Sequence, residues 1–366
     1  MTSTSTIEER LRDELEAVGI DGFIHFQTGR VREYATLRYL SGVGGLEDSG
    51  LIFPADAEPV LVVKDFEEVR ARRESWIRDV RGVTTIPMSA ATKALGDVIR
   101  EKGLIGKKLG VDESELTLEV YMELQKLGVQ LVPFGSTIAR MRMRKTREEI
   151  EKIRRAVEIA ESAINKVEGL VGEGLTEAEL AAEATLTIEK SGGSKAFVIV
   201  QYAENAAIPH GGPTVKPVRG DGLLVVDLGA NVEGYNSDIT RTIIVGRPPA
   251  KQVEYVRAVW EALNSAIARA APGVGVWEVA RAARSVIGKR GLPQPRHRIG
   301  HGLGLNVHEN PIVEEGFNHI LEPGNTITIE PGVYFDGVCG VRFEVDVHIT
   351  KDGCEVLDSS TLKPTI

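Results

Sequence analysis

Two pairs of carboxylates occupy mirrored positions in the sequence, each pair in two strand-like segments around a turn. Asp227 and Asp238 lie in β-branched and aliphatic runs on either side of the turn-like sequence Ala-Asn-Val-Glu-Gly. Glu330 and Glu344 are equidistant from Gly337 in the sequence Phe-Asp-Gly-Val. If both segments fold back on themselves, each pair converges among residues expected to be buried. Carboxylates taken out of water without a partner protonate, so these pairs need cations.

The composition around the first turn predicts its register. A two-residue loop in which Asn231 pairs with Gly234 puts Asp227 directly opposite Asp238. Opposed residues on antiparallel strands point to the same face with Cβ atoms about 4.5–5.5 Å apart, where like charges repel. One Asp in a strand is ordinarily a solvated polar residue, whereas two mirrored pairs indicate a site. Two divalent cations would cancel the charge of the four carboxylates.

Histidines gather near the second carboxylate pair. Glycines flank His301 in the run R-H-R-I-G-H-G-L-G-L-N-V-H-E-N-P, residues 296–311, and His308 follows seven residues later. Glycine permits close backbone approach, so this loop can bring an imidazole to an ion. His210 stands in the sequence I-P-H-G-G ahead of the first pair. A lone histidine is more often a packing or surface residue, but this clustering favours a site.

Five potential ligands therefore occur in a fixed order within short motifs. These motifs are P-H-G, G-Y-N-S-D-I-T-R-T, G-H-G-L-G-L-N-V-H-E, I-E-P-G-V-Y and G-V-R-F-E. The sequence resembles the pita-bread metallopeptidases, specifically the Xaa-Pro group of prolidases and aminopeptidases P. The resemblance implies an α/β (α+β) chain. It places a creatinase/prolidase-like α/β domain over residues 1–137 and a catalytic pita-bread domain with pseudo-twofold symmetry over residues 138–366.

The same resemblance implies how the metal ligands are shared. Asp238 and Glu344 would bridge two divalent ions, Asp227 would complete one ion, and His301 with Glu330 the other. Oxygen ligands with one imidazole suit Mn, Co, Fe or Zn, and the absence of thiolate ligands disfavours a structural zinc site. The implied reaction is attack of a metal-bridging hydroxide on the carbonyl of an Xaa-Pro bond, in dipeptides or at peptide N-termini.

The non-ligand histidines of the family motifs correspond to His210 and His308. We expect both to bind substrate and to act in catalysis by stabilising the tetrahedral state or moving protons, although packing beside the site is the alternative. Glu330 is expected to be catalytic as well as a ligand. His297 also matches a family position and is expected to shape the substrate pocket.

Two further residues are expected to support the ligands. Arg342 lies one strand alternation before Glu344, so it either braces the carboxylates or binds a substrate carboxylate. The hydroxyl of Thr240, on the face of Asp238, is expected to support a ligand from behind. The family usually has Asp after the last Glu ligand, whereas this chain has Val345 followed by Asp346. Alternation predicts that Asp346 replaces part of the missing polar contact.

Composition limits the partners and the compartment. With 44 basic and 53 acidic residues the net charge is −9, which argues against nucleic acid or an anionic membrane as the main partner. There is no membrane-spanning apolar run, the start is polar, and two cysteines are too few for a disulfide scaffold. We therefore expect a cytoplasmic protein, and the resemblance implies that it acts on short proline-containing peptides.

Periodicity predicts the coarse secondary structure. The N-terminal part reads as an α/β unit with helices over 7–18 and 64–75 and strands over 23–27, 50–54, 59–63, 108–112 and 129–134. Capping boxes start helices at Thr146 and Thr176, and two more helices cover about 250–270 and 276–290. The basic run 135–145 is expected to be a solvated connector. The order of two helices and a carboxylate hairpin occurs twice, which predicts two hairpins side by side.

Several alternatives stay open at this point. Another pita-bread enzyme, such as a creatinase-like hydrolase or a lyase, or a non-catalytic binding protein of this fold would share the architecture. Such members typically lose metal ligands, and this chain keeps five. Prolidase and aminopeptidase P differ in how neighbouring loops or a partner subunit close the pocket. The resemblance implies that the N-terminal domain restricts substrate access and that the protein is a homodimer.

Overall fold

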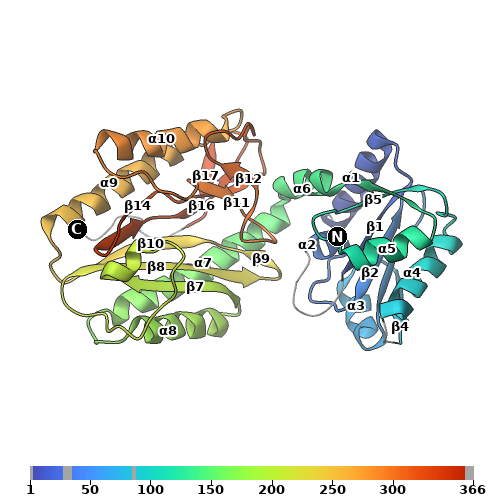
Figure 1. The fold of residues 1–366 in the computed structure, drawn as a ribbon, viewed down its shortest axis with the longest axis horizontal. Helices are drawn as coiled ribbons and strands as arrows, with labels where there is room; N and C mark the ends of the chain where they lie inside the picture. Colours follow the sequence, from blue (N-terminus) through green and yellow to red (C-terminus); the bar gives the residue numbers. More distant parts are fainter. Residues whose placement is uncertain (1–2, 28–34, 85–87, 359–366) are drawn as a thin grey trace. The chain divides into compact units, whose positions relative to one another are not determined.

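In the computed structural model, which describes residues 3–27, 35–84 and 88–358, the chain divides into two compact units (Figure 1). These are Met1–Arg142 and Met143–Ile366. The division falls at the end of α6 (Gly135–Met143), and the predicted boundary at 137/138 lies within the same helix. The expectation of a solvated connector over 135–145 is wrong here. Ile138, Met141 and Arg142 share one helical face and are buried.

The first unit is built on a mixed six-stranded sheet. Its strand order is β4-β3-β2-β1-β5-β6. The pairs β1–β2 and β2–β3 are antiparallel, whereas β3–β4, β1–β5 and β5–β6 are parallel. The five predicted strands are confirmed, while β4 was missed because three of its five residues are charged or glycine. The strands are β1 (Gly22–Gln27), β2 (Ser49–Pro54), β3 (Val60–Lys64), β4 (Asp79–Val83), β5 (Lys108–Val111) and β6 (Gln130–Pro133).

Helices cover this sheet. The two helices predicted over 7–18 and 64–75 are present, the second as a 3₁₀ turn η1 (Asp65–Glu67) followed by α3. Leu95 of α4 and Leu124 of α5 pack in one apolar cluster with Ile24 of β1. The α-helices are α1 (Ser3–Val18), α2 (Ala35–Ser41), α3 (Glu68–Glu74), α4 (Met88–Glu101) and α5 (Leu118–Lys126).

The second unit begins with two helices that pack on an antiparallel sheet. The predicted capping boxes at Thr146 and Thr176 are both formed, and each starts its helix. The sheet has the order β10-β8-β7, with β9 paired to β8. One apolar cluster joins the helices to the sheet. The elements are α7 (Arg147–Leu170), α8 (Glu177–Lys190), β7 (Ser194–Tyr202), η2 (Ala203–Ala207), β8 (Gly222–Val232), β9 (Tyr235–Asn236) and β10 (Ile239–Val245).

The remainder of the second unit repeats this plan, as predicted. Helices α9 and α10 pack on a sheet of order β12-β11-β13-β16-β17, and Figure 1 shows the strands lying between the two helix pairs. No helix in the described residues is long and apolar enough to cross a bilayer. The elements are α9 (Ala250–Ile267), α10 (Val276–Lys289), β11 (Gly300–Gly302), β12 (Glu309–Val313), β13 (Thr326–Ile329), β14 (Gly332–Phe335), β15 (Cys339–Arg342), β16 (Val345–Ile349) and β17 (Cys354–Val356).

The first carboxylate hairpin has a different register from the predicted one. Val232 pairs with Tyr235 and Asp227 pairs with Thr240, so Asp227 is not opposite Asp238. The turn residues are Glu233 and Gly234, which have positive φ values of 50° and 92° and fit the two-residue hairpin turn that matches strand twist. The turn therefore begins one residue later and the pairing shifts by two. A two-residue shift keeps both aspartates on one face.

The second carboxylate hairpin has the predicted register. Pairing is symmetric about Gly337, from Phe335 with Cys339 out to Gly332 with Arg342 in the two-stranded ribbon β14–β15. The same symmetry continues in the sheet, where β13 pairs with β16. Glu330 and Glu344 lie at the interruption between ribbon and sheet. There Glu344 forms an isolated antiparallel bridge with Thr240, which joins the two hairpins side by side.

Candidate metal centre

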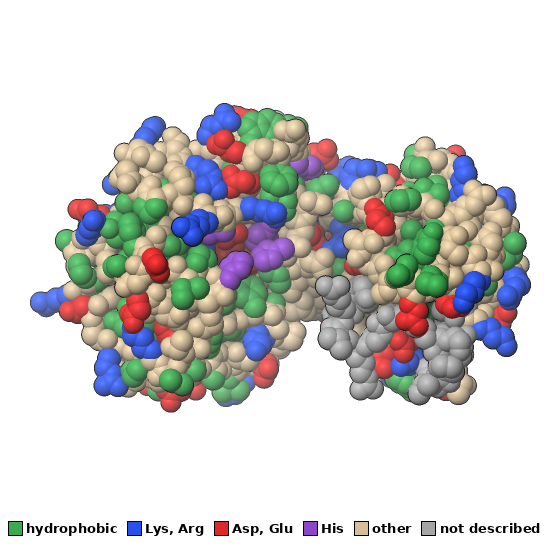
Figure 2. All heavy atoms as spheres, viewed as in Figure 1, with side chains coloured by type: hydrophobic (Ala, Val, Ile, Leu, Met, Phe, Trp, Pro, Cys, Tyr) green, Lys and Arg blue, Asp and Glu red, His purple; other side chains and the backbone are tan. Residues whose placement is uncertain are grey.

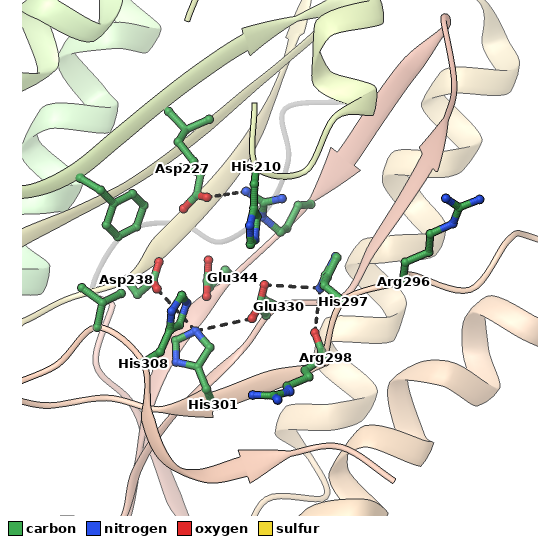
Figure 3. Close-up of a pocket in the computed structure, with 14 residues that line it drawn as sticks. His210, Asp227, Asp238, Arg296, His297, Arg298, His301, His308, Glu330 and Glu344 are labelled. Atoms are coloured by element: carbon green, nitrogen blue, oxygen red, sulfur yellow. Dashed lines mark hydrogen bonds and ion pairs between the residues drawn. The ribbon is translucent and has the colours of Figure 1, made fainter. Parts of the chain in front are cut away.

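The five residues predicted as ligands line one pocket of about 570 Å³ in the second unit (Figure 3). Asp227 comes from β8 and Asp238 immediately precedes β10, while His301 is in the middle of β11. Glu330 follows β13 and Glu344 precedes β16. Four of the five therefore come from strand ends or interruptions, or from a short bulged strand, where the backbone departs from a regular ladder.

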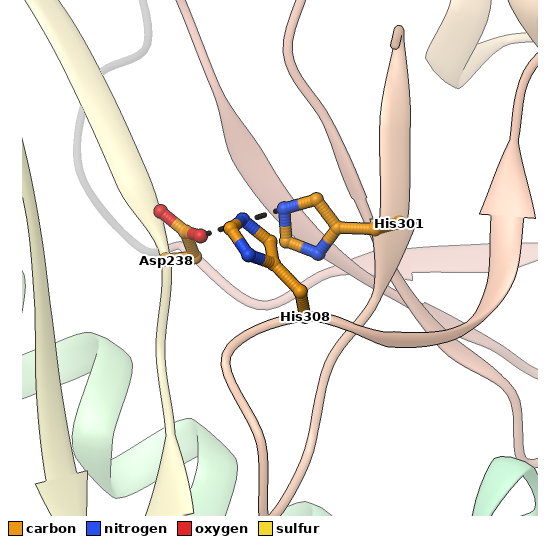
Figure 4. A group of neighbouring side chains, drawn as sticks. All are labelled: Asp238, His301 and His308. Atoms are coloured by element: carbon orange, nitrogen blue, oxygen red, sulfur yellow. Dashed lines mark ion pairs between the residues drawn. The ribbon is translucent and has the colours of Figure 1, made fainter. Parts of the chain in front are cut away.

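The ligand atoms form overlapping groups. His301 Nε2 lies 3.6 Å from Asp238 Oδ2 and 3.5 Å from Glu330 Oε1. Three sets of donor atoms lie within 4.8 Å of one another, and Asp238 and Glu344 each belong to two of them. The sets are Asp227–Asp238–Glu344, His301–Glu330–Glu344 and Asp238–His301–His308, the last drawn in Figure 4. Asp238 and Glu344 are thus the two carboxylates shared between neighbouring groups.

Burial sets the electrostatics of the cluster. Loss of hydration, followed by repulsion from neighbouring carboxylates, raises the pKa of Asp238 and of Glu344 well above their usual ranges. Burial raises the pKa of Glu330 to about 8 and lowers the pKa of His301 to about 3. The His301 ring is therefore neutral near pH 7 and has a lone pair available. Acids held in this way gain from any cation that replaces their protons.

Two buried oxygen atoms test whether divalent ions fit these residues. Asp227 Oδ1 and Glu344 Oε1 are inaccessible to solvent and have no hydrogen-bond partner. Such atoms are costly to bury unless something binds them. Carboxylate oxygens with one neutral imidazole are ligands that borderline divalent ions accept. The donor set and its unpartnered oxygens therefore fit the group that the sequence resemblance implies.

Arg342 supports the cluster from one side. Its Nη2 donates a hydrogen bond to Asp227 Oδ2, and its Nε donates to Thr240 Oγ1 at 3.2 Å. Its Nη1 donates to the hydroxyl of Tyr334 at 2.9 Å and to the carbonyl of Pro209 at 3.4 Å. The Arg342 side chain is buried among these acceptors. Of the two predicted roles, bracing the carboxylates is the one that its contacts favour.

Two contacts cross between the hairpins. The hydroxyl of Thr240 donates to Glu344 Oε2 at 2.7 Å, so its ligand contact is with Glu344 rather than with Asp238. Asp346 Oδ2 accepts a hydrogen bond of 3.0 Å from the backbone N–H of Asp238. Val345 lies in the apolar core of the second half. A polar side chain of each hairpin therefore bonds a predicted ligand residue of the other, Thr240 through the Glu344 carboxylate and Asp346 through the backbone N–H of Asp238.

The predicted non-ligand histidines surround the same pocket. His308 stacks edge-on against His301 with ring centroids 4.1 Å apart, and burial lowers the pKa of His308. His297 Nδ1 lies 3.5 Å from Glu330 Oε2, and burial lowers the pKa of His297 to about 4. His210, in the segment after η2, completes the lining. Figure 2 shows histidine side chains gathered around a hollow in the surface, with acidic side chains at its floor.

Some residues that line the pocket or support its lining were not identified from the sequence. Tyr334 joins His297 to Arg342, because its hydroxyl lies 2.8 Å from His297 Nε2 and accepts from Arg342. The signal for Tyr334 was its place in the motif I-E-P-G-V-Y. Phe197 and Ile199 of β7, together with Val307, give the pocket an apolar wall. Ordinary strand composition carried no sign that this wall faces the site.

Comparison with known proteins assigns both parts of the chain. Residues 151–351 match the model of metallopeptidase family M24, and residues 8–144 match the creatinase/prolidase N-terminal domain. An Xaa-Pro dipeptidase of Pyrococcus horikoshii is 36% identical over 324 residues, which cover 87% of this chain and 89% of that protein.

Solved structures agree over nearly the whole length. The prolidase of Pyrococcus horikoshii has a TM-score of 0.87 and 32% identity, covering 97% of this chain and 99% of its own. An X-Pro aminopeptidase of Thermotoga maritima also has a TM-score of 0.87, with 29% identity, and covers 96% of this chain and 99% of its own. Both structures share the fold of this chain across both of its parts.

Proposed function

The chain belongs to metallopeptidase family M24, and from that premise we propose that it hydrolyses Xaa-Pro bonds in dipeptides or at peptide N-termini. The observation that carries the proposal is the convergence of five ligand residues, with buried carboxylate oxygens that have no hydrogen-bond partner. The names of its relatives, an Xaa-Pro dipeptidase, a prolidase and an X-Pro aminopeptidase, support the substrate class.

We assign two divalent ions to the site. Asp238 and Glu344 would be shared by both ions, Asp227 would complete the site of one ion, and His301 with Glu330 would complete the site of the other. The sharing is supported by the groups to which Asp238 and Glu344 belong. When bound, such ions acidify a water nucleophile and polarise the scissile carbonyl. Mn, Co, Fe and Zn are the candidates, because the donors are oxygen atoms and one imidazole.

The supporting residues hold the ligands in place before substrate arrives. Arg342 fixes Asp227 by a charge-assisted hydrogen bond, and the Thr240 hydroxyl fixes one oxygen of Glu344. Such preorganisation contributes to catalysis because the groups need not reorient during the reaction. Glu330 Oε2, 3.5 Å from His297 Nδ1, is placed to take up a proton.

His210 and His308 act on the substrate. Both line the pocket beside the carboxylates. Because the lowered pKa keeps the His308 ring neutral near pH 7, one ring nitrogen can donate to the developing oxyanion. The departing proline nitrogen needs a proton, which a histidine at the pocket wall can deliver. Tyr334 holds the His297 ring toward the same space.

Selectivity for proline follows from the apolar wall and from the imide bond. The prolyl ring packs against Phe197, Ile199 and Val307. Its nitrogen carries no hydrogen, so a pocket without an acceptor at that point leaves the N–H of an ordinary peptide unsatisfied. An unpaired N–H costs enough to disfavour Xaa-Ala peptides by about 10²-fold.

The decisive experiment compares three substrates on one protein. Protein stripped of metal and reloaded with Mn or Co is assayed for kcat/KM with Leu-Pro, Leu-Ala and Leu-Pro-Gly. We expect cleavage of Leu-Pro at least about 10²-fold more efficient than that of Leu-Ala. The ratio of dipeptide to tripeptide cleavage assigns the protein to the dipeptidases or to the aminopeptidases.

Two outcomes would contradict the proposal. Equal rates for Leu-Pro and Leu-Ala would reject proline selectivity while leaving a dinuclear peptidase. No cleavage of any Xaa-Pro peptide by the loaded protein would favour another chemistry on this fold. We further propose a homodimer in the cytoplasm, as the resemblance to prolidases implies, and sedimentation of the purified protein tests the dimer.

A further inference from the structure

His210 lies in a loop rather than in a strand, and hydrogen bonds hold both ends of this loop in place. The segment 203–213 leaves β7 after Tyr202 through the 3₁₀ turn η2 and is followed by Thr214. We call it the His210 loop. A side chain on a loop is fixed only as firmly as the hydrogen bonds that close the loop. The residues at its two ends therefore bear on where the His210 imidazole lies.

A fully buried carboxylate joins both ends of this loop. Glu177, the first residue of α8, has no solvent-exposed surface. Its Oε1 accepts from the backbone N–H of Tyr202 at 2.6 Å, and its Oε2 accepts from Asn205 Nδ2 at 2.8 Å. The same Oε2 accepts from the backbone N–H of Thr214 at 2.7 Å and from its hydroxyl at 2.5 Å. One side chain thus closes the loop.

The helix that carries Glu177 reinforces this closure. The backbone N–H groups of Glu177 and Ala178, which have no partner within the helix, donate to the carbonyls of Lys216 and Thr214. No cation pairs with Glu177 among the described ion pairs, so N–H and O–H donors alone satisfy its charge. A carboxylate at the first turn of a helix is also favoured by the helix dipole. The position thus suits a carboxylate better than any neutral side chain.

The other side of the His210 loop is hydrogen-bonded to Arg342, which also bonds the predicted ligand Asp227. The carbonyl of Pro209, the residue before His210, accepts from Arg342 Nη1 at 3.4 Å, and Arg342 donates to Asp227. Gln201 Nε2 donates to the carbonyl of Ile208 at 3.0 Å. The His210 loop is therefore held at its base by Glu177 and near its tip by the group that braces a predicted ligand.

We propose that Glu177 is the positioning residue for His210. It touches neither substrate nor metal ligands and acts by fixing both ends of the loop, so that the imidazole reaches the pocket in one place. The proposal rests on the proposed function insofar as His210 acts on substrate. Misplacement of a catalytic group by about 1 Å can lower turnover by about 10²-fold. The role therefore has a measurable consequence even though the residue is remote from the reaction.

The test replaces the carboxylate without changing its size. In Glu177→Gln one acceptor oxygen becomes an N–H₂ group that faces existing donors, so one end of the loop loses its anchor. Glu179→Gln is the matched control, because Glu179 lies two residues later on the same helix and caps only Thr176. We expect faster amide hydrogen exchange over 203–214 in Glu177→Gln only. Metal stoichiometry is expected to stay at the wild-type value in both variants.

Turnover separates positioning from general damage. We expect Glu177→Gln to lower kcat for Leu-Pro by about 10–100-fold with little change in KM. In a His210→Ala background the same change is expected to lower kcat less than about twofold, because the group it positions is gone. An equal loss in both backgrounds would overturn the proposal. So would loop exchange in Glu177→Gln that matches the wild type.

Two safeguards keep the outcome decisive. If Glu177→Gln does not fold, Thr214→Val removes a single donor to the carboxylate and keeps the backbone bond. We then expect a smaller increase in exchange over the same residues, and none would refute the role of Glu177. If the wild-type protein cleaves no Xaa-Pro peptide, the proposed function fails, while exchange in the loop still tests Glu177.

Discussion

The two halves of the second unit each place two carboxylates in an antiparallel hairpin, but they hold them in different registers. In the first half Asp227 lies within the continuous ladder β8–β10 opposite Thr240, and Asp238 lies just before the ladder begins. In the second half Glu330 and Glu344 are at mirrored positions where sheet gives way to ribbon. One pair is therefore diagonal and the other directly opposed.

The difference shows that the carboxylates of a hairpin need to lie on the same face of the sheet, whereas they need not be directly opposite each other. Both arrangements keep their carboxylates on one side, because pairing shifts of two residues preserve the face. Three of the four acids stand at interruptions, where backbone N–H groups bond outside the regular ladder. The Asp238 N–H donates to Asp346, and the Glu344 N–H donates to the carbonyl of Thr240 at 3.1 Å. These cross-bonds make the two unlike hairpins one site.

The largest expected effect comes from the two shared carboxylates, one from each half. Asp238→Asn and Glu344→Gln each remove a negative ligand from two donor groups, so we expect both variants to lose dinuclear binding and activity. Metal content after dialysis, measured by atomic emission, checks this. Asp227→Asn is the comparison, because it belongs to one group only and is expected to keep about one ion per chain. Unchanged metal content in both shared-position variants would refute the sharing.

The next effect compares the two non-ligand histidines. His210→Ala and His308→Ala are each expected to lower kcat by about 10²–10⁴-fold while the ions stay bound. The halves differ here, because only His308 joins a possible metal group, with Asp238 and His301. Metal analysis beside kinetics separates the roles. Loss of an ion in His308→Ala would make His308 a ligand, and near-normal turnover in either variant would indicate a packing role.

A third effect is the pH dependence of the metal-free protein. A carboxyl group whose pKa is raised on folding stabilises the fold below its unfolded pKa, and this stability is lost as pH rises through the folded pKa. Burial raises the pKa of Glu330 to about 8. We therefore expect the unfolding free energy in chelator to fall between about pH 4.5 and pH 8, with about 4 kcal/mol of the decrease due to Glu330.

Urea unfolding at these two pH values, with and without metal, measures the change. Glu330→Gln is expected to remove the share of the decrease due to Glu330, because its amide does not titrate. Saturating metal is expected to cancel the share of the ligand carboxylates, because bound ions replace their protons. The raised pKa values of Glu344, Asp346 and Asp358 in the second half and of Asp238 in the first half add to the decrease. A metal-free protein that becomes more stable over this range would contradict the raised pKa values.

Much of the architecture followed from local signals. The capping boxes at Thr146 and Thr176 start their helices as predicted, because the cap is read from four adjacent residues. The second hairpin was predicted in register because Gly337, with φ of 66°, fixes its turn. The first was missed because Glu233 adopts positive φ, which a non-glycine residue rarely does. The residue types alone did not reveal that choice.

The site residues also divide into those that the sequence predicted and those that it did not. The five predicted ligands line one pocket, because motif chemistry marks residues that carry charge or a ring nitrogen. The anchoring contacts of Glu177 and the cross-hairpin contact of Asp346 depend on residues 25 and 108 positions away. The two partners at these separations are backbone N–H groups, which every residue type except proline provides. The sequence therefore does not identify these partners, although strand alternation had marked Asp346 itself.

The smallest effect tests whether the two halves support each other reciprocally. Thr240 of the first half bonds Glu344 of the second, and Asp346 of the second half bonds the backbone of Asp238 in the first. We expect Thr240→Ala and Asp346→Ala to weaken metal binding by about 10–100-fold each, the usual cost of removing a group behind a ligand. Titration of metal-free protein against a chromophoric chelator gives the affinities.

Two control variants define what this comparison means. Asp346→Asn keeps an oxygen acceptor for the Asp238 N–H and is expected to restore most of the affinity lost in Asp346→Ala. Thr242→Val changes a hydroxyl on the same strand that bonds the carbonyl of Arg342 rather than a carboxylate, so we expect less than about a twofold effect. Equal losses of metal affinity in Thr240→Ala and Thr242→Val would mean that Thr240 contributes only by packing in its strand. Full affinity in Asp346→Ala would mean that metal binding does not depend on this acid, and that Val345 in the apolar core needs no polar compensation.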